Sequence, residues 1–157
     1  MNEGTETKTF TVRRALEQDA NAIARLSVEL GYPATRETMR ERIRAISAST
    51  ADLLVVAADP SGEPVGWLQA HAAQLNESGF RVEIVGLIVA TAARRKGIGR
   101  SLVAAAERWA KSIRAQAIIV RSNIQRTSSH AFYPALNFSA TKTQNVYRKS
   151  LPGDVAP

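Results

Sequence analysis

The sequence predicts an α/β (α+β) domain in which a mixed and mostly antiparallel sheet is flanked by about four helices. Two observations lead to this class. Short apolar runs that alternate as strands do are interleaved with segments whose apolar residues recur at helical spacing. The chain also has 157 residues, 45% hydrophobic and 22% charged, which are ordinary values for one globular domain. We therefore expect one domain over residues 10–151, between flexible ends at 1–9 and 152–157.

The N-terminal part of the chain predicts one strand followed by two helices. Residues 10–13 alternate as a first strand does. Asp19 is the expected N-cap of a helix that Gly31-Tyr32-Pro33 ends, and Thr35, with Thr38, begins a second helix. The apolar faces of these helices consist of Ile23, Leu26 and Leu30 in the first and of Met39, Ile43 and Ile46 in the second.

The middle of the chain predicts three consecutive antiparallel strands, at residues 53–58, 64–72 and 81–89. The first two are joined by the turn Asp59-Pro60-Ser61-Gly62, and the last two by Gln74–Gly79. Short connections of this kind favour neighbouring antiparallel strands, so the segment 81–89 is expected at the centre of the sheet.

The C-terminal part predicts a helix, a strand, a short helix and a final strand. The first helix begins at Ile98, and the three later elements cover 117–120, 128–136 and 146–149. The buried face of the first helix is expected to consist of Ile98, Leu102, Ala106, Trp109 and Ile113.

Composition excludes several kinds of site. The chain has no cysteine, which excludes disulfides, thiolate metal sites and a cysteine nucleophile. Its two histidines, His71 and His130, are too few and too scattered to indicate a metal centre. No apolar run approaches the ~18 residues of a membrane span, and the N-terminus has no signal-peptide core. We therefore expect a cytoplasmic protein that binds no metal.

The formal net charge of +7 permits two interpretations. Clustered cations are typical of proteins that bind nucleic acid. A coenzyme that carries several phosphates also needs cations to bind it. The remaining basic residues are then ordinary solvent-exposed surface residues. Aromatic residues make up only 6% of the chain and are not interleaved with basic ones, so no base-stacking platform is indicated. The composition therefore favours the coenzyme.

The most informative segment is an apolar strand, Val82–Val89, that runs into the basic turn Arg94-Arg95-Lys96-Gly97-Ile98-Gly99 and then a helix. Unpaired N–H groups at a helix N-terminus attract anions, and glycines let a phosphate approach the backbone. A Walker loop would need Gly-Lys-Ser/Thr, which is absent, and a dinucleotide fingerprint would need glycine in place of Leu102. The turn therefore predicts a polyphosphate site of another kind.

This turn has the form Arg/Gln-x-x-Gly-x-Gly/Ala and resembles the acetyl-coenzyme A signature of the GNAT superfamily of N-acetyltransferases. Its context strengthens the resemblance. Leu87-Ile88-Val89 supplies Leu-x-Val five residues before the arginine, and a Phe132-Tyr133 pair follows near the C-terminus. The resemblance extends over roughly residues 10–151 and implies an acetyl-CoA-dependent N-acetyltransferase that acts on a primary amine.

The resemblance also implies how the coenzyme binds. In GNAT folds the fourth and fifth strands splay apart, and the pantetheine arm lies in the gap, paired with the backbone of the fourth strand. The strand residues expected to do this are Leu87, Ile88 and Val89. The residues expected to hold the pyrophosphate are Arg94, Arg95, Lys96, Gly97, Ile98, Gly99 and Arg100.

Glu83 is the expected general base. It is the only acid in an otherwise apolar strand, where a carboxylate is costly to bury without a partner or a role. It stands eleven residues before Arg94, the spacing at which the general-base glutamate lies in histone-type GNAT enzymes. Strand alternation places it on the face of Val85, Leu87 and Val89. The alternative is a structural glutamate that points to solvent or pairs with Arg81.

Tyr133 is the expected general acid. The resemblance places the tyrosine of the Phe-Tyr pair near the thioester sulfur, where a phenol with an ordinary pKa of about 10 donates a proton to the thiolate. The alternative is a core aromatic residue. Arg126 stands where the family commonly has asparagine, so Asn123 is expected to supply an amide to the coenzyme, and Arg126 a charge. Asn137 replaces a glycine but tolerates the left-handed conformation of a helix cap.

The sequence is therefore compatible with three functions. The first is direct acetyl transfer from acetyl-CoA to an amine in a ternary complex, by a protein that GNAT precedent suggests is a homodimer. The second is a non-catalytic acyl-CoA-binding domain that acts as a sensor or partner. The third is a basic nucleic-acid-binding module. The lone histidines His71 and His130 are either structural or part of the acceptor site.

Overall fold

The computed structural model describes residues 9–123 and 125–154 of the chain. The chain divides into two compact units, Met1–Arg121 and Ser122–Pro157, which are described in turn.

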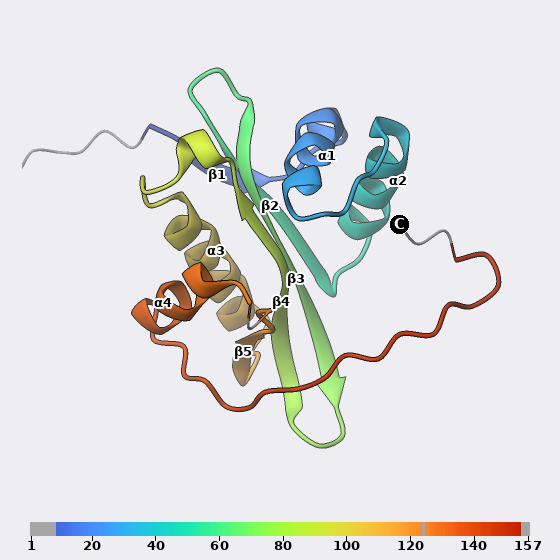
Figure 1. Cartoon of the computed structure of the whole chain (residues 1–157), viewed down its shortest axis with the longest axis vertical. Helices are drawn as coiled ribbons and strands as arrows, with labels where there is room; N and C mark the ends of the chain where they lie inside the picture. Colours follow the sequence, from blue (N-terminus) through green and yellow to red (C-terminus); the bar gives the residue numbers. More distant parts are fainter. Residues whose placement is uncertain (1–8, 124, 155–157) are drawn as a thin grey trace, which may run out of the picture. The chain divides into compact units, whose positions relative to one another are not determined.

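The first unit is built on a five-stranded sheet with the strand order β1-β2-β3-β4-β5 (Figure 1). Its strands are β1 (Thr11–Arg14), β2 (Asp52–Ala58), β3 (Pro64–Leu75), β4 (Gly79–Val89) and β5 (Ala117–Val120). The first four are antiparallel neighbours, and β5 runs parallel to β4. The mixed sheet that the sequence predicts is therefore confirmed.

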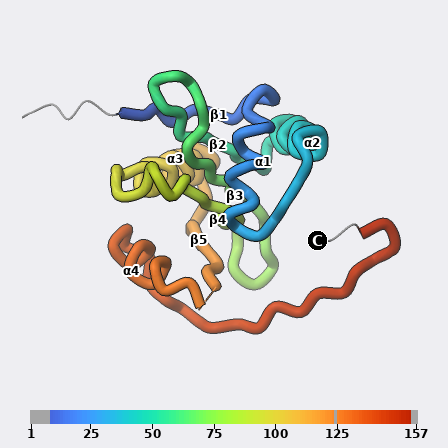
Figure 2. Tube along the Cα trace, turned by 45° about the horizontal axis from the view of Figure 1, so that its top comes forward, coloured from blue at the N-terminus to red at the C-terminus, as the bar shows by residue number. Residues whose placement is uncertain are grey.

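Helices cover the two faces of this sheet (Figure 2). Helices α1 (Ala20–Glu29) and α2 (Arg36–Ser47) lie on one face, and α3 (Ile98–Ser112) lies on the other. The side chains of β3 show the division. Trp67 packs against the cluster formed by α1, α2 and β2, whereas a Cβ on Gly66 would lie 3.3 Å from Ile98 of α3. We call these the α1/α2 face and the α3 face.

Both faces are packed with the residues that the sequence pattern assigns to the core. On the α1/α2 face, Ile23, Met39 and Ile43 meet Leu54 and Val56 of β2. On the α3 face, Leu102 and Ala106 are fully buried, as are Leu68 and Ala70 of β3. Two short 3-10 helices, Glu17–Asp19 and Thr91–Ala93, precede α1 and α3. The sheet is therefore held rigidly between two apolar layers.

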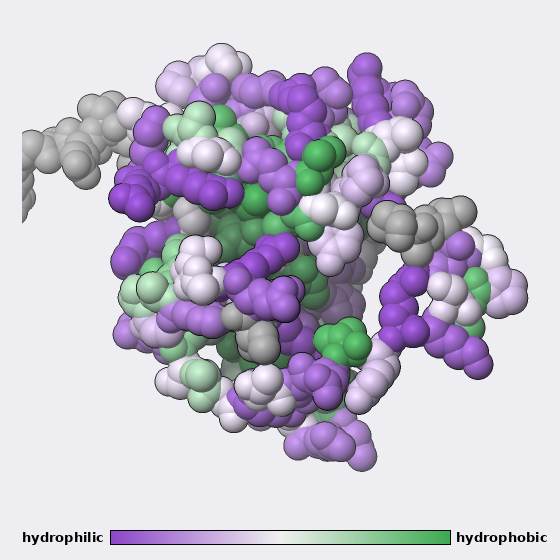
Figure 3. All heavy atoms as spheres, in the orientation of Figure 1, coloured by the Kyte–Doolittle hydropathy of each residue, from purple (hydrophilic) through white to green (hydrophobic). Residues whose placement is uncertain are grey.

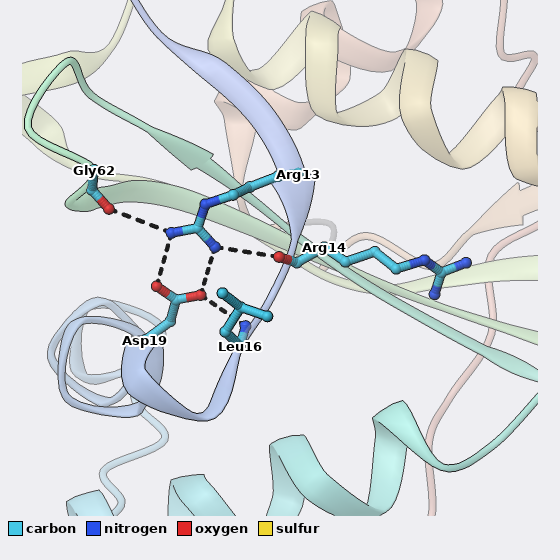
Figure 4. A network of polar contacts seen from close by, with 5 residues as sticks. All are labelled: Arg13, Arg14, Leu16, Asp19 and Gly62. Atoms are coloured by element: carbon cyan, nitrogen blue, oxygen red, sulfur yellow. Dashed lines mark hydrogen bonds and ion pairs between the residues drawn. The ribbon is translucent and has the colours of Figure 1, made fainter.

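Asp19 is the N-cap residue of α1, as predicted, but its side chain forms no capping hydrogen bond. Its carboxylate instead accepts hydrogen bonds from both terminal nitrogens of Arg13, at 2.7 and 2.9 Å, and from the Leu16 N–H (Figure 4). Arg13 also donates to the carbonyl of Gly62. A two-bond Arg–carboxylate pair is stronger than a cap, so the buried carboxylate ties β1, α1 and the β2–β3 turn together. The cap predicted at Thr35 is confirmed by its bond from the Thr38 N–H at 3.1 Å.

The second unit contains α4 (Thr127–Ala135) followed by an extended segment. The left-handed conformation predicted at Asn137 is confirmed by a φ of 67°. The strand predicted at 146–149 is wrong, because residues 139–150 form no regular structure. Val146 and Tyr147 are 88% and 89% exposed. A short run that ends in Arg148 and Lys149 has too little apolar surface to form a strand without a partner.

Candidate active site

β4 has a strand partner along both edges only in its first half. Its pairing with β5 covers Arg81–Ile84 and ends where Ile84 meets Val120. Its pairing with β3 continues to Val89. From Val85 to Val89 the second edge of β4 has no strand partner in the described part of the chain. This confirms the splay of the fourth and fifth strands that the sequence resemblance implies.

A β-bulge lies where the two strands part. Gln69 is paired with Gly86 but the next residue, Ala70, is paired with Ile84, so Val85 is the extra residue and is 52% exposed. The bulge shifts the alternation of side chains along β4. Glu83 therefore shares a face with Gly86 and Ile88, not with Leu87 and Val89 as simple alternation predicts.

Gly86 is required by its contact with the neighbouring strand. A Cβ at this position would lie 2.6 and 2.7 Å from two ring carbons of Trp67, which no real side chain tolerates. The indole thus lies against the backbone of β4 on the α1/α2 face. This close contact holds the bulged part of β4 in place.

The turn between β4 and α3 has the geometry of an anion site. Gly97 is the N-cap of α3 with a φ of 77°, and Arg95 also has a positive φ, of 62°. No atom lies within 4 Å of the position of a Cβ on Gly97. The first N–H groups of α3 have no partner within the helix, and open space stands before them. An anion can therefore approach this end of α3 closely.

The basic residues of this turn differ in what they contact. Arg94 Nε donates to the carbonyl of Val89 at 3.1 Å, and its guanidinium lies 3.7 Å from Glu29 of α1. Arg94 therefore fixes the turn against β4 and α1. Arg95, Lys96 and Arg100 are exposed and form no ion pair with any described residue. Sequence reasoning assigned all four cations to the phosphates, and it did not detect the structural contacts of Arg94.

Glu83 lies at the last paired part of β4, next to the point where β5 departs. Its side chain is 22% exposed, and its carboxylate lies 3.4 Å from Nε of Arg121, which follows β5. The predicted alternative partner, Arg81, donates instead to the Ser78 hydroxyl. Glu83 is thus a partly buried carboxylate with one cationic neighbour. Its exposed part can still contact a second cation.

His71 and Asp52 form a pair on the same face of the sheet. Asp52 Oδ1 lies 2.9 Å from Nδ1 of His71, and in the strand register His71 lies opposite Glu83. Sequence reasoning left His71 unassigned and did not consider Asp52. The pair has no local signal, because its members are 19 residues apart and meet only through the β2–β3 register.

In the second unit, Tyr133 is packed between aromatic rings. The ring centroids of Phe132 and Phe138 lie 5.0 and 5.6 Å from that of Tyr133, both edge to face. Burial raises the pKa of the Tyr133 phenol, and the nearby charge of Arg126 opposes that rise. The phenol is therefore protonated at neutral pH, as the role of an acid requires.

The two residues expected to replace the family's asparagine have local roles in the second unit. The Asn123 side chain accepts a hydrogen bond from the Gln125 N–H at 2.9 Å, and its carbonyl accepts one from the Arg126 N–H. Arg126 is the N-cap residue of α4. His130 lies exposed on the same helix.

The first unit has a polar hollow of about 420 Å³ that is lined by α1, the start of α2 and the β2–β3 turn, with Arg25, Arg36 and Glu63 among its residues. A smaller hollow, of about 140 Å³, lies between α1, α2 and the sheet, and Tyr32, Arg42 and Trp67 line it. The indole Nε1 of Trp67 is buried without a hydrogen-bond partner among the described residues. In the space-filling view, hydrophobic residues are visible at the surface between hydrophilic ones (Figure 3).

No described helix is both long and apolar enough to cross a membrane. No group of three or more His, Asp or Glu side chains in residues 9–123 and 125–154 is arranged to hold a metal ion.

Known proteins resemble this chain over most of its length. The profile of the acetyltransferase (GNAT) family matches residues 15–138. An aminoglycoside N(6')-acetyltransferase type 1 from Stenotrophomonas maltophilia is 27% identical over 146 residues, 90% of this chain and 94% of the relative.

Solved structures of similar fold include the aminoglycoside 6'-N-acetyltransferase AAC(6')-Ih from Acinetobacter baumannii. It has a TM-score of 0.77 and 20% identity over 90% of this chain and 99% of its own. The enzyme AAC(6')-Iy, solved with a bisubstrate analogue of coenzyme A and acetylneamine, has a TM-score of 0.79 and 20% identity over the same shares.

Proposed function

The chain belongs to the GNAT family of acetyltransferases, and from this premise we propose that it transfers the acetyl group of acetyl-CoA to a primary amine. The amine belongs to a small molecule, a peptide or a protein, and it attacks the thioester directly in a ternary complex. The protein is proposed to act in the cytoplasm as a homodimer and without a metal ion.

One observation carries this proposal. The open edge of β4, from Val85 to Val89, leads into the glycine turn before α3. Pantetheine has two amides that can pair with the free backbone groups of Leu87, Ile88 and Val89, as an added strand would. The pyrophosphate would then lie on the N–H groups of Ile98, Gly99 and Arg100, with Arg95 and Lys96 beside it. A single extended ligand fits both features because they are continuous along the chain.

The chemistry follows from the groups at the end of that open edge. An amine arrives as an ammonium ion and must lose a proton before it attacks, and Glu83 is the proposed acceptor through a bound water. Backbone N–H groups of the bulged part of β4 are proposed to polarise the thioester carbonyl as negative charge develops on its oxygen. Tyr133 is proposed to protonate the departing thiolate. With no cysteine in the chain, the most common acyl-carrying nucleophile is absent, which supports direct attack.

Asn123 and Arg126 are proposed to contact the coenzyme from the second unit. Aminoglycosides are the first acceptors to test, because the relatives at 27% and 20% identity carry that name. A non-catalytic acyl-CoA sensor is the main alternative. It would bind the coenzyme through the same edge and turn but would release no thiol in the presence of any amine.

The decisive experiment combines binding and turnover. Calorimetry should show that the wild-type protein binds acetyl-CoA, and thiol release should accompany the addition of an accepted amine. Gly97→Asp should weaken binding about 100-fold or more, because it places a negative charge before the pyrophosphate. Gly97→Asn is the matched control. It has the same shape, tolerates the left-handed backbone and adds no charge, so most of the affinity should remain.

Equal affinity of folded Gly97→Asp and wild-type protein would refute the coenzyme site. Binding without thiol release across a screen of amines and peptides would favour the sensor instead. Salt-dependent binding of DNA in place of acetyl-CoA would indicate the nucleic-acid-binding module.

A further inference from the structure

Three ionisable side chains lie next to one another across the sheet. Asp52 of β2 is opposite His71 of β3, and His71 is opposite Glu83 of β4. Directly opposed residues of antiparallel strands point to the same face, with Cβ atoms about 4.5–5.5 Å apart. The row therefore lies on the α1/α2 face, and it ends at the point where β4 and β5 separate.

The contact between Asp52 and His71 fixes how the imidazole is protonated. A carboxylate has no proton to donate, so at 2.9 Å Asp52 Oδ1 accepts a hydrogen bond from the Nδ1–H of His71. The neutral ring then carries its lone pair on Nε2. The Asp52 side chain is only 17% exposed, whereas that of His71 is 49% exposed. Nε2 therefore belongs to an oriented ring that solvent can reach.

Glu83 has a cationic neighbour on the side of β5 and faces His71 on the side of β3. Nε of Arg121 lies 3.4 Å from its carboxylate. Imidazole ordinarily changes charge near neutral pH, which is what a proton acceptor needs under physiological conditions. The charged groups that face His71 are Asp52 on β2, Glu83 and Arg81 on β4, and Arg121 after β5.

We infer that His71, oriented by Asp52, receives the proton that leaves the acceptor amine, and that it acts in series with Glu83. This inference rests on the proposed acetyl transfer. Glu83 takes the proton from the amine through a bound water, as proposed above, and passes it on to Nε2 of His71. Asp52 is a positioning residue, because its carboxylate contacts the imidazole and not the reacting atoms.

The proton and electron balance is complete without another reactant. The ammonium nitrogen gives one proton through Glu83 to His71, and its freed lone pair forms the new bond to the carbonyl carbon. The carbon–sulfur bond breaks, its electron pair leaves on sulfur, and Tyr133 protonates the thiolate. The nitrogen then loses its second proton to solvent, and solvent returns one proton to the phenolate of Tyr133. The imidazolium of His71 releases its proton to solvent.

The test compares the two histidines of the chain. His71→Gln should lower kcat about 10²-fold near neutral pH, with acetyl-CoA affinity unchanged. The difference in kcat between this variant and wild type should become smaller as pH rises towards the pKa of the amine, since free amine needs no base to begin the attack. His130→Gln is the matched control, because His130 is exposed on α4, and it should leave the pH profile unchanged.

Two further variants separate a catalytic from a structural role. Free imidazole should restore part of the activity of His71→Gly. Asp52→Asn should preserve the fold but weaken the orientation of the ring, and it should shift the acidic limb of the kcat/KM profile. A His71→Gln profile parallel to wild type at every pH, without rescue by imidazole, would overturn the inference while leaving acetyl transfer intact. Wild-type protein that binds acetyl-CoA but acetylates no amine would overturn the proposed function, and this inference with it.

Discussion

The two halves of β4 belong to one strand but have different surroundings. Residues Gly79–Ile84 have β3 on one edge, and from Arg81 they have β5 on the other. Residues Val85–Val89 have β3 alone. Ile84 is 2% exposed, whereas the next residue, Val85, is 52% exposed.

The difference shows how one strand can serve both stability and binding. In the first half, both backbone edges are paired from Arg81 onward, and the side chains of Val82 and Ile84 are buried. In the second half, the side chain of Ile88 is still buried, but one backbone edge is left unpaired. The bulge at Val85 separates the two. Substitutions on either side of it should therefore affect different measurements.

The largest effect is expected for the paired half. Ile84→Ala should lower the free energy of unfolding by about 2–5 kcal/mol, because it removes a buried side chain and leaves a cavity. Val85→Ala, one residue away, should change it by less than about 1 kcal/mol, since that side chain is half exposed. Urea titration measures both. Equal losses would show that the bulge does not separate a structural half from an open one.

A smaller effect is expected for Glu83, which lies at the boundary between the two halves of β4. Glu83→Gln should lower turnover about 10²-fold, most strongly at low pH where little free amine exists. Because Gln keeps the size of the side chain, stability and acetyl-CoA affinity should stay close to wild type. Initial-rate plots against both substrates should intersect, as a ternary complex requires. Parallel plots, or an acetylated enzyme that can be isolated, would contradict direct attack.

The next smaller effect concerns the hydrogen exchange of backbone amides in β4. Saturating acetyl-CoA should slow hydrogen exchange in the segment Val85–Val89, by roughly tenfold or more if the pantetheine pairs with it. Exchange in Gly79–Ile84 should hardly change, because those amides already lie between strands. Peptide-level mass spectrometry with coenzyme A as a second ligand measures this. Equal protection of both halves would indicate general stabilisation and not strand addition.

The smallest effect concerns the proposed acid, which lies outside β4. Because burial raises the pKa of Tyr133, the folded state holds this proton more tightly than the unfolded chain does. The stabilisation linked to this higher pKa of the folded state is therefore fully present at neutral pH, and it is lost as pH rises above about 10. Arg126→Gln should move the phenol's titration further upward, which absorbance at high pH can follow. A downward shift would mean that Arg126 does not act on this group.

Local patterns in the sequence were sufficient for most elements. Alternation and helical spacing predicted five strands and four helices that the structure contains. Thr35 capped its helix as expected, because a cap depends on residues three positions apart. Asp19 lies at the N-cap position as expected but forms no capping bond, because Arg13, a residue on a strand, binds the same carboxylate. The strand expected at 146–149 failed because a strand needs a partner, and a local pattern cannot supply one.

The sequence by itself predicted the family, which is confirmed, and it singled out the glycine turn before α3 and Glu83 as candidate sites, since each prediction depends on residues close together in the chain. Only the tertiary structure decided the direction of side chains beyond Val85, because a bulge is a property of two paired strands. It also decided that Arg94 contacts Val89 and Glu29, and that Asp52, His71 and Glu83 form one row. Some of these contacts join residues far apart in the chain, such as Asp52 and His71, which are separated by 19 positions. Their distances are set by strand register, which follows from packing of the whole sheet.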